Sequence, residues 1–383
     1  MIHASPILEP IDHRVADMIR AQRIALNHRI AQNPNRWTGV LRRSTFARAI
    51  QGSNSIEGYN ATLADAGEIV DEARPDMLAE ETAKALEGYR TAMTYILRVH
   101  DDPHTHVDTG FIRSLHFMML SHDLSKLPGQ WRTGDVFIVH EPTGDRVYEG
   151  PDADLVPGLM DALVAQIDDT ATGDALIRGA MAHLNLAMIH PFRNGNGRMA
   201  RALQTLVLAR DGVSSPVFSS IEEWLGRNTL AYYDVLAQVG RGSWHPENDA
   251  LPWVRFCLKA HYQQAATIVR RNEEMGRMWT EIHELTAGRG LPERCELALI
   301  DAALGFRVRN GRYRKENEIS EVVASRDLKR LCDAGLLEAV GEKRGRYYVA
   351  AAPLLAVRDK CRDRRAVSDP YTIARNRSDS AAL

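Results

Sequence analysis

Apolar residues recur at helical spacing along most of the chain. Ile11, Val15 and Met18 fall three or four residues apart and share one face of a helix predicted at 11–31. The chain is therefore expected to be mainly α-helical. The same period predicts further helices at 44–57, 62–73, 78–99, 111–122, 154–168, 175–189, 197–210, 221–239 and 250–275.

One stretch has the pattern of a β-hairpin instead. The segments VFIV (136–139) and RVYEG (146–150) are rich in β-branched and aromatic residues, and they flank a loop that contains Gly144. We expect two antiparallel strands here, set among helices.

Turn-forming residues and changes of pattern predict how the chain is divided. The cluster DDPHTHVDTG at 101–110 predicts the first boundary. The last residues, 368–383, are polar and poor in core formers, so we expect a loose end. The predicted units are an N-terminal helical region at 1–105, a helical core at 106–275, a third unit at 290–352 and a C-terminal tail at 353–383.

Composition fits a globular protein without a general attraction to nucleic acid or membranes. The 383 residues are 44% hydrophobic and 26% charged, and the formal net charge is −2. No apolar stretch approaches the length of a membrane span, and the start MIHASPILEPIDHR lacks the pattern of a secretory signal. Four widely spaced cysteines without a CxxC pair fit reduced thiols. We expect a cytoplasmic protein.

The densest candidate chemistry lies in HPFRNGNGRMAR, residues 190–201. Pro191 disfavours helical geometry at His190, so the preceding helix should end there. Gly195 and Gly197 precede a new helix, whose first N–H groups can converge on an anion. No Gly-Lys-Ser/Thr follows a strand, so this is not a Walker A loop. The residues alone favour either a polyphosphate site or an ordinary helix start with solvated arginines.

The whole twelve-residue stretch resembles the signature of the Fic family, His-Pro-Phe-x-(Asp/Glu)-Gly-Asn-Gly-Arg-x-x-Arg. It departs from that signature only at Asn194. Residues 121–163 resemble the family's flap, with a Pro-Gly-x-x-Arg lead, a β-hairpin and a Val-Pro-x-Leu-Met helix start. WLGRNTLAYYDVLAQV (224–239) resembles the segment on the adenine side of the pocket. The resemblance covers about residues 40–260.

The resemblance implies a protein adenylyltransferase, which transfers AMP from ATP to a hydroxyl group of a protein. His190 would be the general base, because a histidine with its ordinary pKa of about 6.5 is largely neutral near pH 7. Phe192 would anchor the loop in the core. For Tyr232 an ordinary core role stays equally open. The implied ATP-binding residues are Val136, Arg193, Asn194, Gly195, Asn196, Gly197, Arg198, Arg201, Tyr232, Tyr233 and Leu236.

Asn194 is the one departure from the family's loop. The family usually has a carboxylate at this position that helps to hold Mg²⁺ on the phosphates. An amide oxygen can still bind a hard cation, but without the charge, so the resemblance implies a weaker Mg²⁺ site at Asn194. An alternative is therefore a weakly active nucleotide-binding regulator that acts on DNA or a partner protein. Removal of AMP from a modified protein, or use of another nucleotide, also stays open.

A second motif precedes the loop. GSNSIEGYN (52–60) resembles the family's inhibitory signature Ser/Thr-x-x-x-Glu-Gly/Asn, which falls here on Ser53, Glu57 and Gly58. Ser53 and Glu57 share one helical face, and Gly58 fits a helix stop. The resemblance implies that Glu57 pairs with Arg201 and inhibits the enzyme. The alternative is a routine helix end with an exposed glutamate.

The C-terminal part has a different pattern. ERCELALIDAAL (293–304) is helical, a basic stretch and a second helix follow, and LEAVGEKRGRYYVA (337–350) suggests two strands around a basic turn. This resembles the winged helix–turn–helix that often ends such Fic proteins. It would either bind DNA through Arg326, Lys329 and Arg330 or serve as a dimer or partner surface.

The implied partners follow from these segments. A target protein would present a Ser, Thr or Tyr hydroxyl on the flap, with self-modification expected. DNA and a second copy of the chain are further candidates, and no membrane partner is expected.

Overall fold

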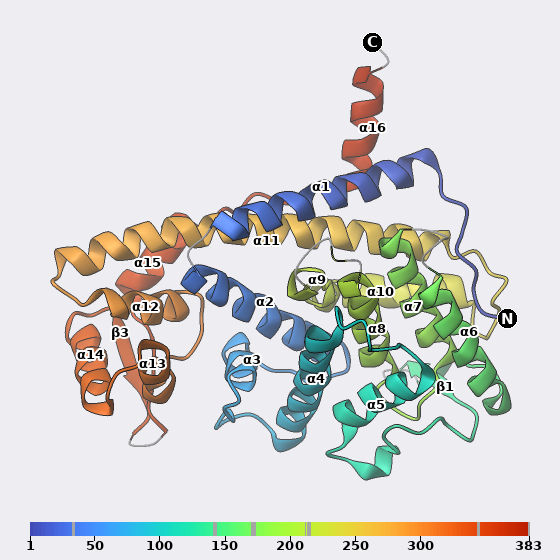
Figure 1. Cartoon of the computed structure of the whole chain (residues 1–383), viewed down its shortest axis with the longest axis horizontal. Helices are drawn as coiled ribbons and strands as arrows, with labels where there is room; N and C mark the ends of the chain where they lie inside the picture. The colour runs from blue at the N-terminus through green and yellow to red at the C-terminus, as the bar shows by residue number, and fades with distance from the viewer. Residues whose placement is uncertain are drawn as a thin grey trace.

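A computed structural model describes residues 1–32, 35–140, 144–169, 174–210, 212, 216–342 and 345–381. The expected mainly helical fold is confirmed. Figure 1 shows the long helix α11 running along the molecule with α1 beside it. The helices are α1 (Pro10–Gln32), α2 (Asn35–Ile56), α3 (Leu63–Val70), α4 (Glu80–Val99), α5 (Thr109–Leu120), α6 (Val156–Asp168), α7 (Ala175–Ile189), α8 (Asn196–Arg210), α9 (Glu222–Arg227), α10 (Thr229–Gly240), α11 (Leu251–Gly288), α12 (Glu296–Ala303), α13 (Asn310–Asn317), α14 (Glu321–Asp333), α15 (Ala352–Cys361) and α16 (Pro370–Ala381), with single 3₁₀ turns at Leu124–Lys126, Ala153–Leu155, Pro216–Phe218 and Glu293–Cys295.

Two small antiparallel hairpins complete the fold. Strands β1 (Phe137–His140) and β2 (Asp145–Glu149) confirm the expected flap hairpin, although residues 141–143 of its turn lie outside the described part. Strands β3 (Leu337–Val340) and β4 (Tyr347–Ala350) pair near the C-terminus. Val308 bridges to Tyr348 of β4, so a third short segment joins this sheet. The winged-helix assignment stays a prediction.

Several predicted helix limits are wrong, because local backbone geometry and packing, not the apolar period alone, decide where those helices begin and end. Helix α2 begins at Asn35 rather than at 44, and α3 ends at Val70 rather than at 73. The helix expected at 221–239 is two helices, because Asn228 leaves the helical region (φ −125°, ψ 35°). Helix α11 continues thirteen residues beyond the expected end at 275, since Met278, Trp279 and Ile282 extend its buried stripe.

The expectation of a loose end at 368–383 is wrong for residues 370–374. Helix α16 lies there and its first turns pack on α1 and α11. The Tyr371 hydroxyl donates to Asp12 Oδ1 over 3.0 Å, and Ala374 is buried. A few contacts are enough to dock a helix of polar composition, which sequence composition does not reveal.

The expected unit limits at 105 and 275 fall where the structure is continuous. Residue 275 lies inside α11, and one core cluster contains Ile50 and Leu86 together with Leu186 and Leu203. The limits stay predictions. Within the described ranges, none of the helices has the length and apolar character needed to cross a bilayer.

The centre of the fold is the pair α7–α8. Every residue of α7 except Arg178 is buried, and α8 is buried from Arg198 to Ala209. Two helices buried on all sides cannot shift without opening the core. The loop that joins them, residues 190–195, is therefore held on a rigid base.

Candidate active site

His190 ends α7 in a left-handed conformation (φ 51°, ψ 57°), and its N–H donates to Leu186 over 3.0 Å. Its Nδ1 lies 3.2 Å from the carbonyl oxygen of Ala187. Because a carbonyl only accepts, Nδ1 must carry the proton, and Nε2 keeps its lone pair. Burial lowers the pKa of His190, and the opposing effects of Ala187 and Glu57 do not restore it. The side chain is therefore a neutral base near pH 7.

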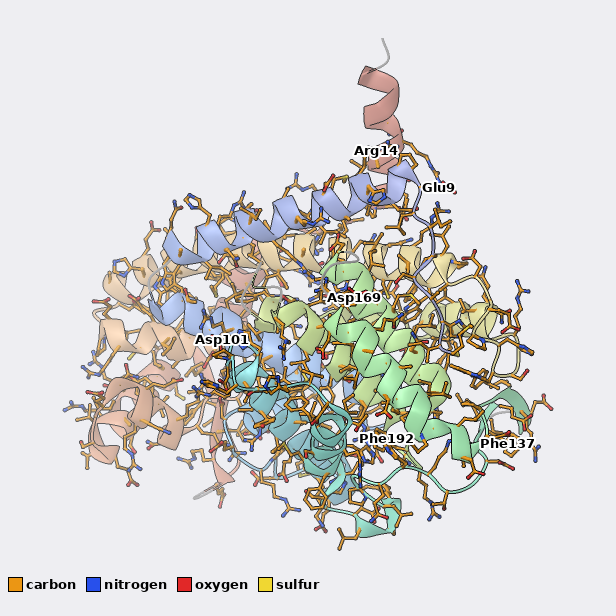
Figure 2. The ribbon with its side chains drawn as sticks, turned by 45° about the vertical axis from the view of Figure 1, so that its right-hand side comes forward. Glu9, Arg14, Asp101, Phe137, Asp169 and Phe192 are labelled. Carbon is orange, nitrogen blue, oxygen red and sulfur yellow. The ribbon has the colours of Figure 1, made fainter. Side chains whose placement is uncertain are left out.

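The loop after His190 is held by the stacking of two rings and by two hydrogen bonds between an asparagine side chain and the loop backbone. The buried ring of Phe192 stacks on His116 with centroids 3.7 Å apart and an interplanar angle of 8°. Asn196 accepts from the Phe192 N–H at 2.9 Å and donates to its carbonyl at 2.8 Å. Figure 2 shows Phe192 among the helices, in contrast to Phe137 on the outlying flap. Phe192 thus anchors the loop, and the Asn196 side chain holds the backbone of Phe192 in place.

His116 supports the same loop from α5, a role that the sequence did not indicate. The Gly129 N–H donates to its Nδ1 at 2.8 Å, so its Nε2–H donates to the carbonyl of Asn194 at 2.9 Å. Burial lowers the pKa of His116 to about 4, so the ring stays neutral, with Nδ1 as the acceptor and Nε2 as the donor.

Arg132 holds the loop from the flap side. Its Nε donates to the His190 carbonyl at 2.9 Å, and its own N–H donates to Pro191 at 2.9 Å. A third bond, at 2.8 Å, runs from its NH1 to Gly134. The Pro-Gly-x-x-Arg lead marked this arginine in the sequence, but only the structure shows that it fixes the backbone of His190.

A carboxylate of the chain itself, that of Glu57, lies at the start of α8. A Cβ built on Gly197 would lie 2.3 Å from Glu57 Oε1, so only glycine lets the carboxylate approach so closely. Gly195 has a φ of +75°, and a Cβ there would lie 2.9 Å from Leu120. The first N–H groups of a helix and the helix dipole favour an anion at such a point.

Arg201 and Glu57 form the ion pair expected from the inhibitory motif. Arg201 NH2 lies 2.7 Å from Glu57 Oε1, and the arginine also donates to the hydroxyl (2.8 Å) and carbonyl (2.9 Å) of Ser53. Burial alone would raise the pKa of Glu57, but the charges of Arg201 and Arg198 outweigh it and lower the pKa. Glu57 is therefore ionised. Gly58, with a φ of +83°, ends the motif just after α2.

Several buried donors around Glu57 remain free for a further anion. Arg198 is fully buried, yet its Nε and NH1 have no hydrogen-bond partner among the described residues, and neither does NH1 of Arg201. Buried cationic donors without acceptors are unfavourable unless an anion satisfies them. An anion with several oxygens, such as a polyphosphate, fits this set of donors.

The other expected ATP-binding residues lie around this centre at different depths. Arg193 and Asn194 are exposed on the loop, and Val136 and Leu236 are partly buried. The half-exposed Tyr233 donates through its hydroxyl to the carbonyl of Ile56 over 3.0 Å. Tyr232 is buried, with its hydroxyl 3.0 Å from His183 Nε2, so its side chain takes the core position that the sequence left open. Their roles in binding ATP stay predictions.

The residues fit a nucleotide better than a resident metal ion. Among the described residues, no group of three or more His, Cys, Asp or Glu side chains is placed to hold a metal. Asn194 offers one neutral amide oxygen on the loop. A magnesium ion here would depend on phosphate oxygens for most of its ligands.

Comparison with known proteins gives the class to which this fold and loop belong. Residues 106–208 match the model of the Fic/DOC family. The chain carries a Fic/DOC family domain, and the matched residues contain the flap, α7, the loop and most of α8.

Named relatives extend this likeness beyond the domain. Protein adenylyltransferase fic-1 of Caenorhabditis elegans is 24% identical over 262 residues, which is 67% of this chain and 47% of the relative. Protein adenylyltransferase Fic of Nematostella vectensis is 27% identical over 253 residues, or 63% of this chain and 54% of the relative. The chain thus spans about half the length of the curated relatives that it matches.

Solved structures share the fold. A Fic family protein from Desulfovibrio desulfuricans has a TM-score of 0.58 at 21% identity, covering 91% of this chain and 98% of that one. A fragment of Fic-1 from C. elegans has a TM-score of 0.55 at 22% identity and covers 68% of this chain and 72% of the fragment. The likeness of this chain to the first of these structures therefore extends well beyond residues 106–208.

Proposed function

We propose that this protein is an adenylyltransferase that moves AMP from ATP to a hydroxyl group of a protein. The observation that carries the proposal is the neutral His190, whose Nε2 keeps its lone pair, on the loop that leads to the start of α8. The names of the relatives support the same activity.

The reaction needs one base and a phosphate cradle. The hydroxyl oxygen of the target attacks the α-phosphorus, its proton passes to Nε2 of His190, and the bond to the β-phosphate breaks to release pyrophosphate. The N–H groups at Gly197, with Arg198 and Arg201, would hold the phosphate oxygens. Tyr233, Leu236 and Val136 would line the adenine side. Bound Mg²⁺ would neutralise charge on the phosphates, with the amide oxygen of Asn194 as its ligand from the loop.

Asn194 favours a second candidate, a nucleotide-binding regulator with slow turnover. Its signal would pass through residues 290–352 to DNA or a partner protein. Arg326, Lys329 and Arg330 are exposed on α14, although Lys329 pairs with Asp333 at 3.0 Å.

The position of the label in ATP separates the two candidates. Wild type and Glu57→Gly, each with a matched His190→Ala partner, should be incubated with ATP labelled at either the α- or the γ-phosphate. We expect protein-bound label from α-labelled ATP only, and none in the His190→Ala variants. Label from γ-labelled ATP would mean phosphoryl transfer. Nucleotide binding without any label would favour the regulator.

The flap offers an edge for the target. The N–H of Gly150 donates to the carbonyl of Val136 over 3.1 Å, so the backbone groups of Val136 face β2. Because successive residues of an antiparallel strand point their backbone groups to opposite sides, the N–H of Phe137 points to the outer edge of β1. The end of β2 is tied to the body, since the N–H of Glu149 donates to Gly242 over 3.0 Å. We infer that an extended target segment adds along β1 and presents its hydroxyl to His190.

Proline at position 137 tests this edge. Phe137→Pro removes one outward N–H, so we expect modification of the target to fall about ten-fold, while ATP binding stays unchanged. Phe137→Ala is the matched control, because it removes the ring that lies over Arg146 but keeps the N–H. Equal losses in both variants would assign the effect to the ring and reject strand addition.

A further inference from the structure

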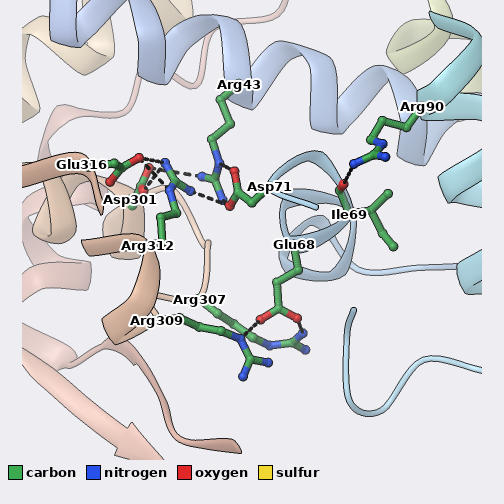
Figure 3. Close-up of polar contacts among 10 residues, drawn as sticks. All are labelled: Arg43, Glu68, Ile69, Asp71, Arg90, Asp301, Arg307, Arg309, Arg312 and Glu316. Carbon is green, nitrogen blue, oxygen red and sulfur yellow. Dashed lines mark hydrogen bonds and ion pairs between the residues drawn. The ribbon is translucent and has the colours of Figure 1, made fainter. Parts of the chain in front are cut away.

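Residues 290–352, here called the C-terminal unit, are tied to α3 and the segment after it by ion pairs between residues more than 230 positions apart in the sequence. Figure 3 shows the two of these pairs that Glu68 makes with Arg307 and Arg309. Glu68 on α3 accepts from Arg307 at 3.0 Å and from Arg309. Arg307 also reaches Asp65 at 2.6 Å, and Arg309 reaches Asp76 at 3.0 Å. We call these five side chains the latch.

A second set of ion pairs backs the latch. Arg43 on α2 binds Asp71 through two bonds of 2.8 and 2.6 Å, and Arg312 on α13 binds the same carboxylate at 2.8 Å. Both arginines also contact Asp301 on α12, at 3.3 and 3.0 Å. These pairs join α2, α3 and the C-terminal unit into one polar cluster.

The centre of the cluster is shielded from water, unlike an ordinary surface ion pair, whereas Asp76 at its edge is 56% exposed. The ring of Phe306 is 1% exposed and lies 4.1 Å below the guanidinium of Arg43. A Cβ on Gly67 would approach this ring to 2.4 Å, so α3 lies directly against it. The Glu68 side chain is only 4% exposed. Water therefore screens these charges less than it screens exposed pairs.

The latch also reaches the short segment that inhibits the active site. Residues 57–62, which we call the inhibitory segment, run from the end of α2 to the start of α3. Glu57 pairs with Arg201, and the ring of Tyr59 lies 5.1 Å from the guanidinium of Arg198. Both phosphate-binding arginines thus contact this segment.

Asp65 is the direct link between the inhibitory segment and the latch. Its Oδ2 accepts from the Thr62 N–H at 3.0 Å, and its own N–H donates to the Thr62 hydroxyl at 3.1 Å, which closes a capping box at the start of α3. Its Oδ1 accepts from Arg307. Burial would raise the pKa of Asp65, but hydrogen bonds from Thr62 and Arg307 lower it, so the carboxylate stays charged.

We propose that the C-terminal unit is the regulatory arm of the enzyme: through the latch it fixes α3 and holds the inhibitory segment on the phosphate site. The inference rests on the proposed function, since its effect is read as control of transfer. When the latch opens, α3 loses its outer support, Glu57 leaves Arg201 more often, and the site accepts the γ-phosphate. A ligand of the C-terminal unit that competes for Arg307 and Arg309 would activate the enzyme.

Neutralising Glu68 tests the latch. Glu68→Gln keeps the shape of the side chain, and we expect self-modification to rise about three- to ten-fold, because part of the free energy that holds the segment is lost. Hydrogen exchange of residues 57–66 should become faster by a similar factor. Asp333→Asn is the matched control, because it breaks an exposed ion pair in the same C-terminal unit. It should change neither readout.

A double variant distinguishes an effect on inhibition by Glu57 from a general loss of stability of the fold. In the Glu57→Gly background, Glu68→Gln should add nothing, because the inhibitory carboxylate is already absent. Faster exchange with unchanged self-modification, or no change in either, would overturn the latch. If Glu68→Gln unfolds, Arg309→Gln tests the same bond from a side chain that is 22% exposed. Failure of Glu57→Gly itself to transfer AMP would count against the proposed function, whereas the exchange rates still report on the latch.

Discussion

Replacing Glu57 with glycine should raise self-modification by roughly ten- to hundred-fold. The carboxylate lies against Gly197 and pairs with Arg201 at 2.7 Å, where the outer phosphates of ATP would bind. A hydrogen bond to a charged group contributes about 1.5–3 kcal/mol, and that amount sets how far the equilibrium favours the inhibited state. In the complex of this variant with ATP, a phosphate would take the place of the lost carboxylate, so Arg201 would keep an anionic partner.

Two further substitutions distinguish charge from bulk at this site. Glu57→Gln keeps the size of the side chain but not its charge, so we expect activation between that of wild type and Glu57→Gly. Arg201→Ala removes the inhibitory partner together with the phosphate ligand, and should not activate. The measurement is label transfer from α-labelled ATP at matched protein concentration. Autoinhibition is excluded if Glu57→Gly transfers no more label than wild type.

Local pattern was sufficient for most of the helices and for the flap. The apolar period located α4, α5, α7 and α8 to within a few residues, because those helices bury one face or all of their surface. It could not locate the break at Asn228, where a single residue leaves the helical region between two apolar stretches.

The site was predictable where the chemistry is local and hidden where it depends on distant contacts. The loop sequence indicated His190, the glycines and the arginines. The pairing of Glu57 with Arg201 was implied by the resemblance to the family, not by local chemistry. His116 acts through a backbone carbonyl of the loop, and no sequence pattern indicated it. The Pro-Gly-x-x-Arg lead marked Arg132, but not its bond to the carbonyl of His190. In the same way, nothing near Glu68 in the sequence points to Arg307 and Arg309.

The tail shows a third kind of failure. Polar composition suggested a loose end, yet α16 is docked by a hydroxyl bond from Tyr371 and by the buried Ala374. The docked segment needs few apolar residues of its own, because it covers a surface that belongs to α1 and α11.

The largest expected loss follows from His190→Ala. Removing a general base typically lowers the rate about 10²- to 10⁴-fold, since the hydroxyl must then lose its proton to water. Nucleotide binding should stay close to that of the parent, because in the proposed site α8, Arg198 and Arg201, not His190, would hold the phosphates. The comparison is best made in the Glu57→Gly background, where transfer is not masked by inhibition. His13→Ala, an exposed histidine on α1, is the matched control and should leave transfer unchanged.

The dependence of transfer on pH tests the same residue without removing it. Burial lowers the pKa of His190 below its ordinary value, so the ring is still mostly neutral at a pH where a solvated histidine is half protonated. Transfer should therefore persist as the pH falls through about 6.5 and decline only under more acidic conditions. Because the charge of Glu57 raises the pKa of His190, the decline should begin at lower pH in Glu57→Gly than in wild type. Transfer that already falls steeply above pH 7, or that survives in His190→Ala, would assign the base to another group.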